Sequence, residues 1–274
     1  MHKAILNKYV NIYIPKIIRG RKMKVPIWKI LNAIFYKIKT GVQWHLLPLK
    51  EFFGNLSISY QSVYYHYNKW CKIGIFHKVY NHLLKEYKHL LDCSILNFDG
   101  SHSPTKRGGE KVGYQGRKKS KTTNMLILSD KTGIPLAISP GISGDHHDLY
   151  KIEIFTREIL EYTSQILGNL EGLFLNADAG FDSKKFIQLL NEYSIFPNVD
   201  KNKRNTKKQD LLDYVFDDEL YKFRFSVEQT NAWIDNYKSL IIRCMTSSKN
   251  WEQSHYISFI SMFLRNRIMV NFNF

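Results

Sequence analysis

The stretch CSILNFDGSH, residues 93–102, marks the point at which the chain changes character. It holds a short apolar run, residues 95–98, which ends in Asp99 and Gly100. A short apolar run bounded by turn-forming residues is typical of a buried strand. An acidic residue beside glycine at the end of a strand is well placed to face a cleft. The stretch therefore predicts the first strand of an α/β region, with Asp99 at its end.

The chain after this stretch alternates between strand and helix patterns. We expect strands at 122–129, 134–139, 173–176 and 195–199, and helices at about 149–167, 183–192, 226–240 and 251–270. The first two of these strands flank the turn at 130–133, which is typical of a hairpin. A hairpin followed by strand–helix crossovers predicts a mixed sheet flanked by helices.

The chain before this stretch has the pattern of an all-helical region. Apolar residues recur at helical spacing in 27–38, 57–73 and 76–91, and Gly41 is placed to end the first of these helices. We therefore expect two parts, a helical region over 1–90 and an α/β domain over 91–274.

Composition points to a polyanionic partner. The 274 residues include 40 Lys and Arg against 24 Asp and Glu, a net charge of +16. Nucleic acid is the commonest partner of so basic a protein, and a membrane surface is the alternative. No apolar run approaches the roughly 18 residues of a spanning helix, and no signal peptide is evident. Three widely spaced cysteines, Cys71, Cys93 and Cys244, are consistent with the cytoplasm and form no metal cluster.

Three acidic residues are candidates for a metal site. Asp178 follows the apolar run at 173–176, as Asp99 follows 95–98, and Glu228 lies on the expected C-terminal helix. Three carboxylates suit Mg²⁺, and two such ions can activate a nucleophile on a phosphodiester. Tyr221 and Arg224 share the helical face of Glu228 if that helix extends backward. The alternatives are turn or cap roles for the aspartates and a surface Arg224–Glu228 pair.

Other segments carry further candidates. Two basic runs suit phosphate contacts, although solvated loops have the same composition: Lys106, Arg107, Arg117, Lys118, Lys119 and Lys121, and Lys201, Lys203, Arg204, Lys207 and Lys208. In the segment DHHD, residues 145–148, we expect Asp148 to cap a helix rather than bind a metal. Ser101 and His102 lack the partners of a hydrolase triad.

Taken together, these motifs resemble those of bacterial insertion-sequence transposases of the Asp/Asp/Glu (DDE) type. The resemblance lies in DGSH at 99–102, KRGGE at 106–110, GYQGRKK at 113–119, KTTN at 121–124, SGDHHD at 143–148, ADAGFDS at 177–183, and Tyr-x2-Arg-x3-Glu over 221–228. Residues 31–48, with Gly41, Gln43, Trp44 and Pro48, resemble the family's N-terminal DNA-binding region.

The resemblance implies a ribonuclease H-like catalytic domain in which Asp99, Asp178 and Glu228 hold two Mg²⁺ or Mn²⁺ ions. Asp182 lies close to Asp178 in sequence, but Asp178 directly follows the strand, as the family's second aspartate does. The family often has Lys or Arg seven residues after the glutamate. This chain has Asp235 there, and Lys238, one turn further, is the candidate substitute.

The implied activity is cleavage at the ends of a transposable element and transfer of the 3′-hydroxyl ends to target DNA. Tyr221, Arg224, Lys238 and the basic runs would contact double-stranded DNA. The terminal inverted repeats would be read by Gln61, Asn68, Lys69 and Lys72, or by the helix at 27–38. We expect a homodimer on DNA, in the bacterial cytoplasm at the nucleoid. The alternatives are an inactive, domesticated DNA-binding protein and a metal-dependent nuclease that does not join strands.

Overall fold

The computed structural model describes residues 3–15, 23, 25–201 and 216–268. The chain divides into two compact units. The first, here the helical unit, comprises Met1–Glu86, Lys106–Gly109 and Ile234–Phe274, and the second, the sheet unit, comprises Tyr87–Thr105 and Glu110–Trp233. The first segment of the helical unit ends at Glu86, close to the expected boundary at residue 90. The described residues 234–268, expected in the α/β domain, instead group with the helical unit.

The helical unit is built around a helix from the C-terminal part of the chain. Its helices are α1 (Lys3–Tyr9), α2 (Ile27–Thr40), α3 (Leu49–Phe53), α4 (Tyr60–Lys72), α5 (Ile75–Glu86), α10 (Lys238–Ile241) and α11 (Ser248–Phe263), the last continued by a π-helical turn, Leu264–Ile268. α11 contacts α2, α4 and α5. Nearly all of its side chains are buried, as expected of a central helix.

Local sequence explains the ends of the predicted helices. Gly41 ends α2 in the left-handed conformation (φ 73°), as expected, because a residue with a Cβ adopts this conformation at a cost. Ser59 caps α4 by accepting a hydrogen bond from Ser62 N. The buried Tyr67 hydroxyl of α4 bonds Ser254 Oγ (2.8 Å) and donates to Asn250 O (3.1 Å). These two bonds join α4 to α11.

The sheet unit contains a seven-stranded mixed sheet. Its strands are β1 (Ile95–Pro104), β2 (Gly113–Gln115), β3 (Ser120–Ser129), β4 (Pro135–Ile138), β5 (Ile142–Ser143), β6 (Phe174–Ala177) and β7 (Phe196–Val199). The order is β2-β3-β1-β6-β7, with β4 and β5 also paired to β3. β1 runs antiparallel to β3 and parallel to β6, and β7 is parallel to β6. This is the expected hairpin followed by crossovers, and with the helical N-terminal region it confirms the predicted fold class.

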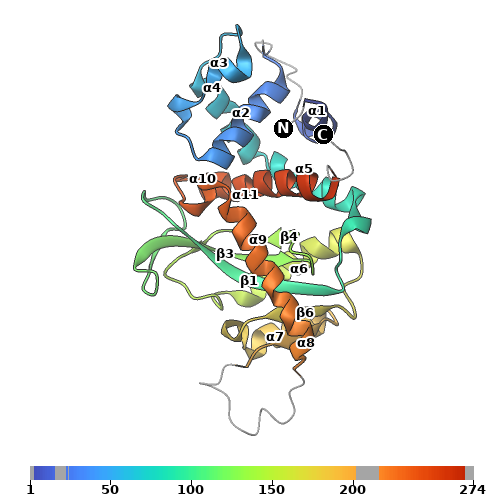
Figure 1. The fold of residues 1–274 in the computed structure, drawn as a ribbon. Helices are drawn as coiled ribbons and strands as arrows, with labels where there is room; N and C mark the ends of the chain where they lie inside the picture. Colours follow the sequence, from blue (N-terminus) through green and yellow to red (C-terminus); the bar gives the residue numbers. More distant parts are fainter. Residues whose placement is uncertain (1–2, 16–22, 24, 202–215, 269–274) are drawn as a thin grey trace. The chain divides into compact units, whose positions relative to one another are not determined.

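Helices cover both faces of this sheet. They are α6 (Ile152–Leu167), α7 (Lys184–Glu192), α8 (Asp218–Tyr221) and α9 (Phe225–Asp235). Phe98 of β1 packs on Phe186 of α7, whereas its neighbour Asn97 bonds Ser226 of α9. Successive side chains of a strand point to opposite faces, so α7 and α9 lie on different faces. Figure 1 shows α9, in orange, crossing the front of the sheet.

Two elements differ from the sequence expectation in ways that concern the candidate site. β1 has ten residues and places Asp99 in mid-strand rather than at the strand's end. Its second half pairs with β3 alone, since β6 ends opposite Phe98, and the half-exposed polar residues there show no apolar pattern. The helix expected at 226–240 starts earlier and ends at Asp235. The one-turn 3-10 helix Lys222–Arg224 joins α8 to α9, so Tyr221, Arg224 and Glu228 lie on one continuous helical segment, as the motif required.

Among the described residues, no helix has the length and apolarity needed to cross a membrane.

Candidate active site

The register of two parallel strands brings the two aspartates together. Asn97 pairs with Asn176, and Phe98 with Ala177, between β1 and β6. Continuing this register places Asp99 beside Asp178. Asp99 follows Asn97 by two residues, and Asp178 follows Asn176 by two, so their side chains lie on the same face of the sheet as that of Asn97. The Asn97 side chain bonds Ser226 of α9. The two carboxylates therefore share the face of the sheet that α9 covers.

Arg224 joins all three predicted carboxylates. Its Nη2 lies 3.6 Å from Asp99 Oδ1 and 3.7 Å from Asp178 Oδ2, and its Nη1 donates to Glu228 Oε1 at 3.1 Å. The Arg224–Glu228 contact is thus more than a surface pair along one helix, because the same guanidinium reaches Asp99 on β1 and Asp178 directly after β6. β1, the residue directly after β6, and α9 each contribute one carboxylate to this cluster.

Burial gives Asp99 unusual acid–base behaviour. Its side chain is 17% exposed. Burial is the largest cause that raises the pKa of Asp99 to about 6, Arg224 opposes the shift, and the charges of Asp178 and Asp148 contribute to it. Negative charge is therefore crowded at this position and is only partly offset by one guanidinium.

The chemistry of the cluster suits divalent cations. Its donors are carboxylate oxygens, the ligands that Mg²⁺ and Mn²⁺ prefer. Within the described part of the chain, Arg224 Nε and Asn231 Oδ1 are buried beside the cluster without hydrogen-bond partners. Asn231 also donates from Nδ2 to Asp99 Oδ2 (3.4 Å). The three carboxylates surround Arg224, and the described residues contain no preformed set of three metal ligands. Metal binding would therefore require the guanidinium to move.

The structure separates Asp178 from its sequence neighbour Asp182. Asp182 Oδ1 pairs with Lys201 Nζ at 3.3 Å. Asp178 Oδ1 accepts from Gly180 N (2.8 Å) and so caps a short 3-10 helix, Ala179–Phe181, while its Oδ2 faces Arg224. Asp178 thus has a cap role and also belongs to the carboxylate cluster.

Asp148 has a different structural role from the one expected. α6 begins at Ile152, and its N-cap is Lys151, so the predicted cap role of Asp148 is wrong. Asp148 Oδ1 instead accepts from Asn124 Nδ2 (2.6 Å). A Cβ at Gly100 would lie 2.5 Å from this oxygen, so glycine at 100 is what allows the carboxylate to approach β1.

The motif residues around Asp148 form a polar group on β1 and β3. His102 Nε2 lies 3.9 Å from Asp148 Oδ1, and His102 Nδ1 bonds Thr122 Oγ1 at 3.0 Å. Burial lowers the pKa of His102, and the charge of Asp148 opposes this shift. The sequence signal for this group was the pair of motifs DGSH and SGDHHD, but only the strand register shows that they meet.

Two of the predicted motif residues remain, Tyr221 and Lys238. Tyr221 is half-buried, its ring packs on Phe216 (5.0 Å), and burial raises its pKa. Lys238 is exposed at the start of α10, in the helical unit. It does not continue α9, because the helix is interrupted after Asp235. Sequence reasoning missed Asn231, which reaches Asp99 from the same helical face as Arg224 and Glu228.

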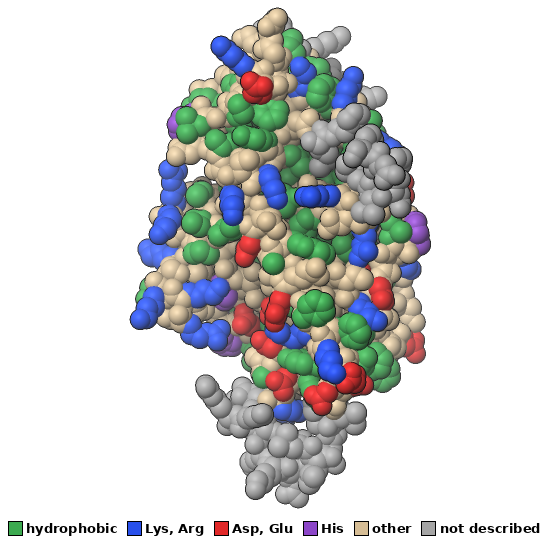
Figure 2. Space-filling model, viewed as in Figure 1, with side chains coloured by type: hydrophobic (Ala, Val, Ile, Leu, Met, Phe, Trp, Pro, Cys, Tyr) green, Lys and Arg blue, Asp and Glu red, His purple; other side chains and the backbone are tan. Residues whose placement is uncertain are grey.

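The basic candidates of the first run are exposed. Arg117, Lys118 and Lys119 lie at the turn between β2 and β3, Lys121 lies on β3, and Lys106 and Arg107 belong to the helical unit. Figure 2 shows basic side chains gathered over the β2–β3 hairpin and acidic side chains where α9 crosses the sheet. In the second run, Lys201 pairs with Asp182, and Lys203, Arg204, Lys207 and Lys208 lie outside the described residues.

The candidate DNA-reading residues of α4 divide into two groups. Gln61, Lys69 and Lys72 are exposed, and Tyr65, which sequence reasoning did not single out, is 59% exposed between them. Asn68 is half-buried and accepts a hydrogen bond from Asn250 Nδ2 (3.1 Å). Asn68 therefore has a structural partner within the helical unit.

Comparisons with known proteins agree with these motifs. A family model described as a transposase DDE domain matches residues 92–264, and one described as a transposase of the IS4/5 family matches residues 8–80. No curated protein matches significantly.

Similar solved structures include a piggyBac transposase synaptic complex with hairpin DNA, at 11% identity and a TM-score of 0.44, covering 97% of this chain and 78% of that one. A pre-cleavage Mos1 transpososome has 12% identity and a TM-score of 0.32, covering 92% and 82%. The catalytic domain of Mos1 mariner transposase has 11% identity and a TM-score of 0.30, covering 73% and 91%. At such TM-scores the likeness carries no argument, and the two sequence models decide the family.

Proposed function

Because the chain belongs to the family of insertion-sequence transposases with a DDE domain, and so acts on DNA, we propose that Asp99, Asp178 and Glu228 are its catalytic carboxylates. The protein would cleave the ends of its own element and join the resulting 3′-hydroxyl ends to target DNA. The observation that carries this proposal is the contact of one guanidinium, Arg224, with all three carboxylates.

The carboxylates would hold two Mg²⁺ or Mn²⁺ ions. When bound, such ions supply activation of the attacking hydroxyl and charge stabilisation at the leaving oxygen. Asn231 would keep one oxygen of Asp99 oriented. Arg224, released from the carboxylates, would grip a DNA phosphate with its two parallel N–H donors. Water would first attack the phosphodiester at the element's end, and the freed 3′-hydroxyl would then attack the target, without ATP and without a covalent protein intermediate.

The exposed basic residues supply the contacts to DNA. Arg117, Lys118 and Lys119 would follow the phosphate backbone, which fixes orientation without reading sequence. Gln61 and Lys69 of α4 would reach base edges in the major groove of the terminal inverted repeat. Since two element ends must be joined, the working form would be a homodimer on DNA, in the bacterial cytoplasm at the nucleoid.

The deciding experiment is strand cleavage and joining. Purified protein is mixed with a labelled duplex carrying the element's own ends and a target plasmid, with Mg²⁺ or with EDTA. Mg²⁺-dependent nicking with a joined product is expected for the wild type. Asp99→Asn and Glu228→Gln should bind DNA but not cut it, whereas Asp182→Asn, the matched control, should cut normally. Binding without cutting would leave a DNA-binding relic, and cutting without joining would indicate a nuclease.

A further inference from the structure

Three asparagines form a continuous side-chain ladder across the parallel part of the sheet. Asn97, Asn176 and Asn198 stand in register on β1, β6 and β7, with exposures of 0%, 0% and 3%. Asn198 Nδ2 donates to Asn176 Oδ1 (2.8 Å), and Asn176 Nδ2 donates to Asn97 Oδ1 (3.0 Å). Asparagine is depleted in strands, and a buried amide is costly unless its hydrogen bonds are made.

The second hydrogen of each amide leaves the sheet toward one chain segment. Asn97 Nδ2 donates to Ser226 Oγ (2.8 Å), and Asn176 Nδ2 donates to Leu220 O (2.8 Å). Asn198 Nδ2 donates to Asp217 O (3.0 Å), and its Oδ1 accepts from Asp217 N (2.9 Å). The ladder therefore holds residues 217–226, the segment that carries Tyr221 and Arg224 and leads into Glu228.

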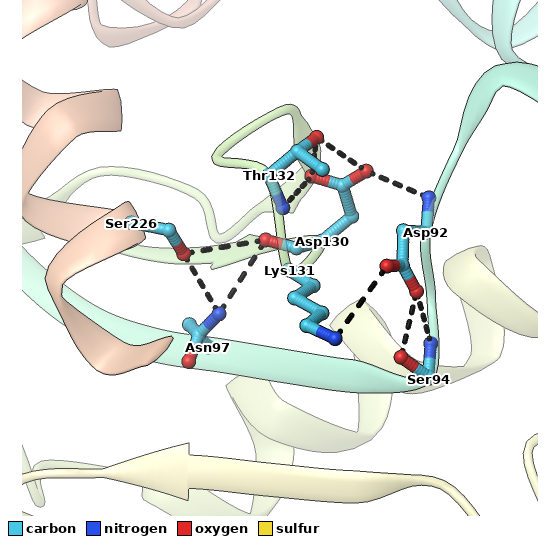
Figure 3. A network of polar contacts seen from close by, with 7 residues as sticks. All are labelled: Asp92, Ser94, Asn97, Asp130, Lys131, Thr132 and Ser226. Carbon is cyan, nitrogen blue, oxygen red and sulfur yellow. Dashed lines mark hydrogen bonds and ion pairs between the residues drawn. The ribbon is translucent and has the colours of Figure 1, made fainter. Parts of the chain in front are cut away.

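A hairpin turn holds the start of α9 from the other side. Figure 3 shows Asn97 Nδ2 and Ser226 Oγ both directed at Asp130 O. The two hydrogen bonds are 3.4 and 3.5 Å long. The buried Asp130 carboxylate accepts from Asp92 N and from Thr132 N. One turn further along α9, the Thr230 hydroxyl donates to Gly133 O (2.7 Å). The first two turns of α9 are thus bound to both β1 and the β3–β4 turn.

Two of the ladder asparagines precede the aspartates of the carboxylate cluster by two residues in the chain. Asn97 precedes Asp99 by two residues, and Asn176 precedes Asp178 by two, on the same face of neighbouring strands. Two residues of a strand span roughly 6.6 Å. Ser226 likewise precedes Glu228 by two. Each catalytic carboxylate is therefore close in the chain to one anchored group.

We propose that Asn97, Asn176, Asn198 and Ser226 are positioning residues that set the distance of Glu228 and Arg224 from the two strand aspartates, and thereby the affinity for the divalent ion. This inference rests on the proposed function, because it assumes that the carboxylates bind metal. Outer groups that orient metal ligands commonly change metal affinity 10–100-fold when they are mutated.

The amide is the only side chain of its size that fits each place in the ladder. Every Asn donates two hydrogens and accepts at least one, in a single direction along the sheet. Asp at position 176 would lose both donors and place a carboxylate against Asn97 Oδ1 and Leu220 O. Ala at position 226 is the mildest change, because it removes one hydroxyl and leaves Asn97 its bond to Asp130 O.

The test compares Ser226→Ala and Asn176→Asp with a matched control, Thr163→Val. Thr163 of α6 is fully buried, and its hydroxyl donates only locally, to Ile159 O (2.7 Å). For each full-length variant without DNA, Mn²⁺ affinity is measured by calorimetry, and amide exchange over 217–226 by mass spectrometry. We expect Mn²⁺ binding about tenfold weaker in both ladder variants, faster exchange confined to that segment, and changes below about twofold in the control.

The outcomes separate this inference from the proposed function. Wild-type protein that binds Mn²⁺ and cleaves DNA, with ladder variants that match Thr163→Val, would overturn the positioning role. Wild-type protein that binds no Mn²⁺ would refute the metal site, and with it the effect of the ladder on metal affinity. Unchanged exchange over 217–226 in Ser226→Ala would overturn the anchoring itself. If Asn176→Asp does not fold, Ser226→Ala decides.

Discussion

Replacing Asp99 by asparagine is expected to stabilise the metal-free protein while it removes catalysis. Burial raises the pKa of Asp99 to about 6, against about 3.9 in an unfolded chain. Between these values the folded protein binds the proton more tightly than the unfolded chain does. The free energy of unfolding therefore falls as pH rises through this window, and above pH 6 the charged carboxylate is a net cost to the fold.

The size of the effect on stability follows from the pKa shift of Asp99. A difference of about two pKa units corresponds to about 3 kcal/mol at pH 7.5, and about half of that at pH 5. Asparagine removes this cost, although Arg224 then loses one of its three partners. A gain of 2–3 kcal/mol, as an order of magnitude, would raise Tm by roughly 4–10 °C in a protein of this size.

The assay is thermal unfolding in EDTA at pH 7.5 and pH 5, for wild type, Asp99→Asn and Asp182→Asn. Asp182→Asn is the control, because it removes an aspartate that is paired with Lys201 and should give no gain. Added Mg²⁺ should raise the Tm of the wild type but not that of Asp99→Asn. An Asp99→Asn protein that melts at or below the wild-type temperature in EDTA at pH 7.5 would refute the reasoning.

Four further predictions concern DNA binding, metal binding and the helical unit. Arg117→Ala should lower the dependence of log affinity on log salt by about 1, measured by DNA titration at several salt concentrations. Gln61→Ala should weaken binding to the element's end by about 1–3 kcal/mol but leave random DNA unaffected in the same titration, and equal losses would count against base reading. Tyr67→Phe should cost about 1 kcal/mol of stability in denaturant unfolding, because two buried bonds to α11 are lost. The Mg²⁺ midpoint for nicking should rise by up to about tenfold per pH unit below pH 6, because protons then compete for Asp99, and a flat midpoint would contradict this.

Elements with a clear apolar period were predictable from the sequence. The pattern over residues 27–38 predicted α2, which spans Ile27–Thr40, because one face of that helix is buried and the other is not. The run at 173–176 predicted β6, Phe174–Ala177, because a short continuous apolar run is typical of a strand that is buried on both faces. The Tyr221, Arg224 and Glu228 spacing predicted a shared helical face, which the continuous segment through the 3-10 turn confirms.

The features that depend on strand register were not predictable. β1 continues for five residues past Asp99, and its polar second half is held by pairing with β3 rather than by burial of apolar side chains. Asp148 reaches Asn124 only because β3 lies beside β1 at Gly100. The role of the buried asparagines was not predictable either, since a hydrogen-bond partner on a neighbouring strand leaves no local pattern in the sequence.

The central position of α11 also has a consequence for how the protein is made. The ribosome releases α2, α4 and α5 long before α11, although these helices pack against it in the finished helical unit. Until Ser248–Phe263 has left the ribosome, the earlier helices can pack on one another but lack the cover that α11 provides. α2, α4 and α5 therefore complete their packing only after α11 has been synthesised. A message cut short after the sheet unit should yield chains that cannot complete the helical unit.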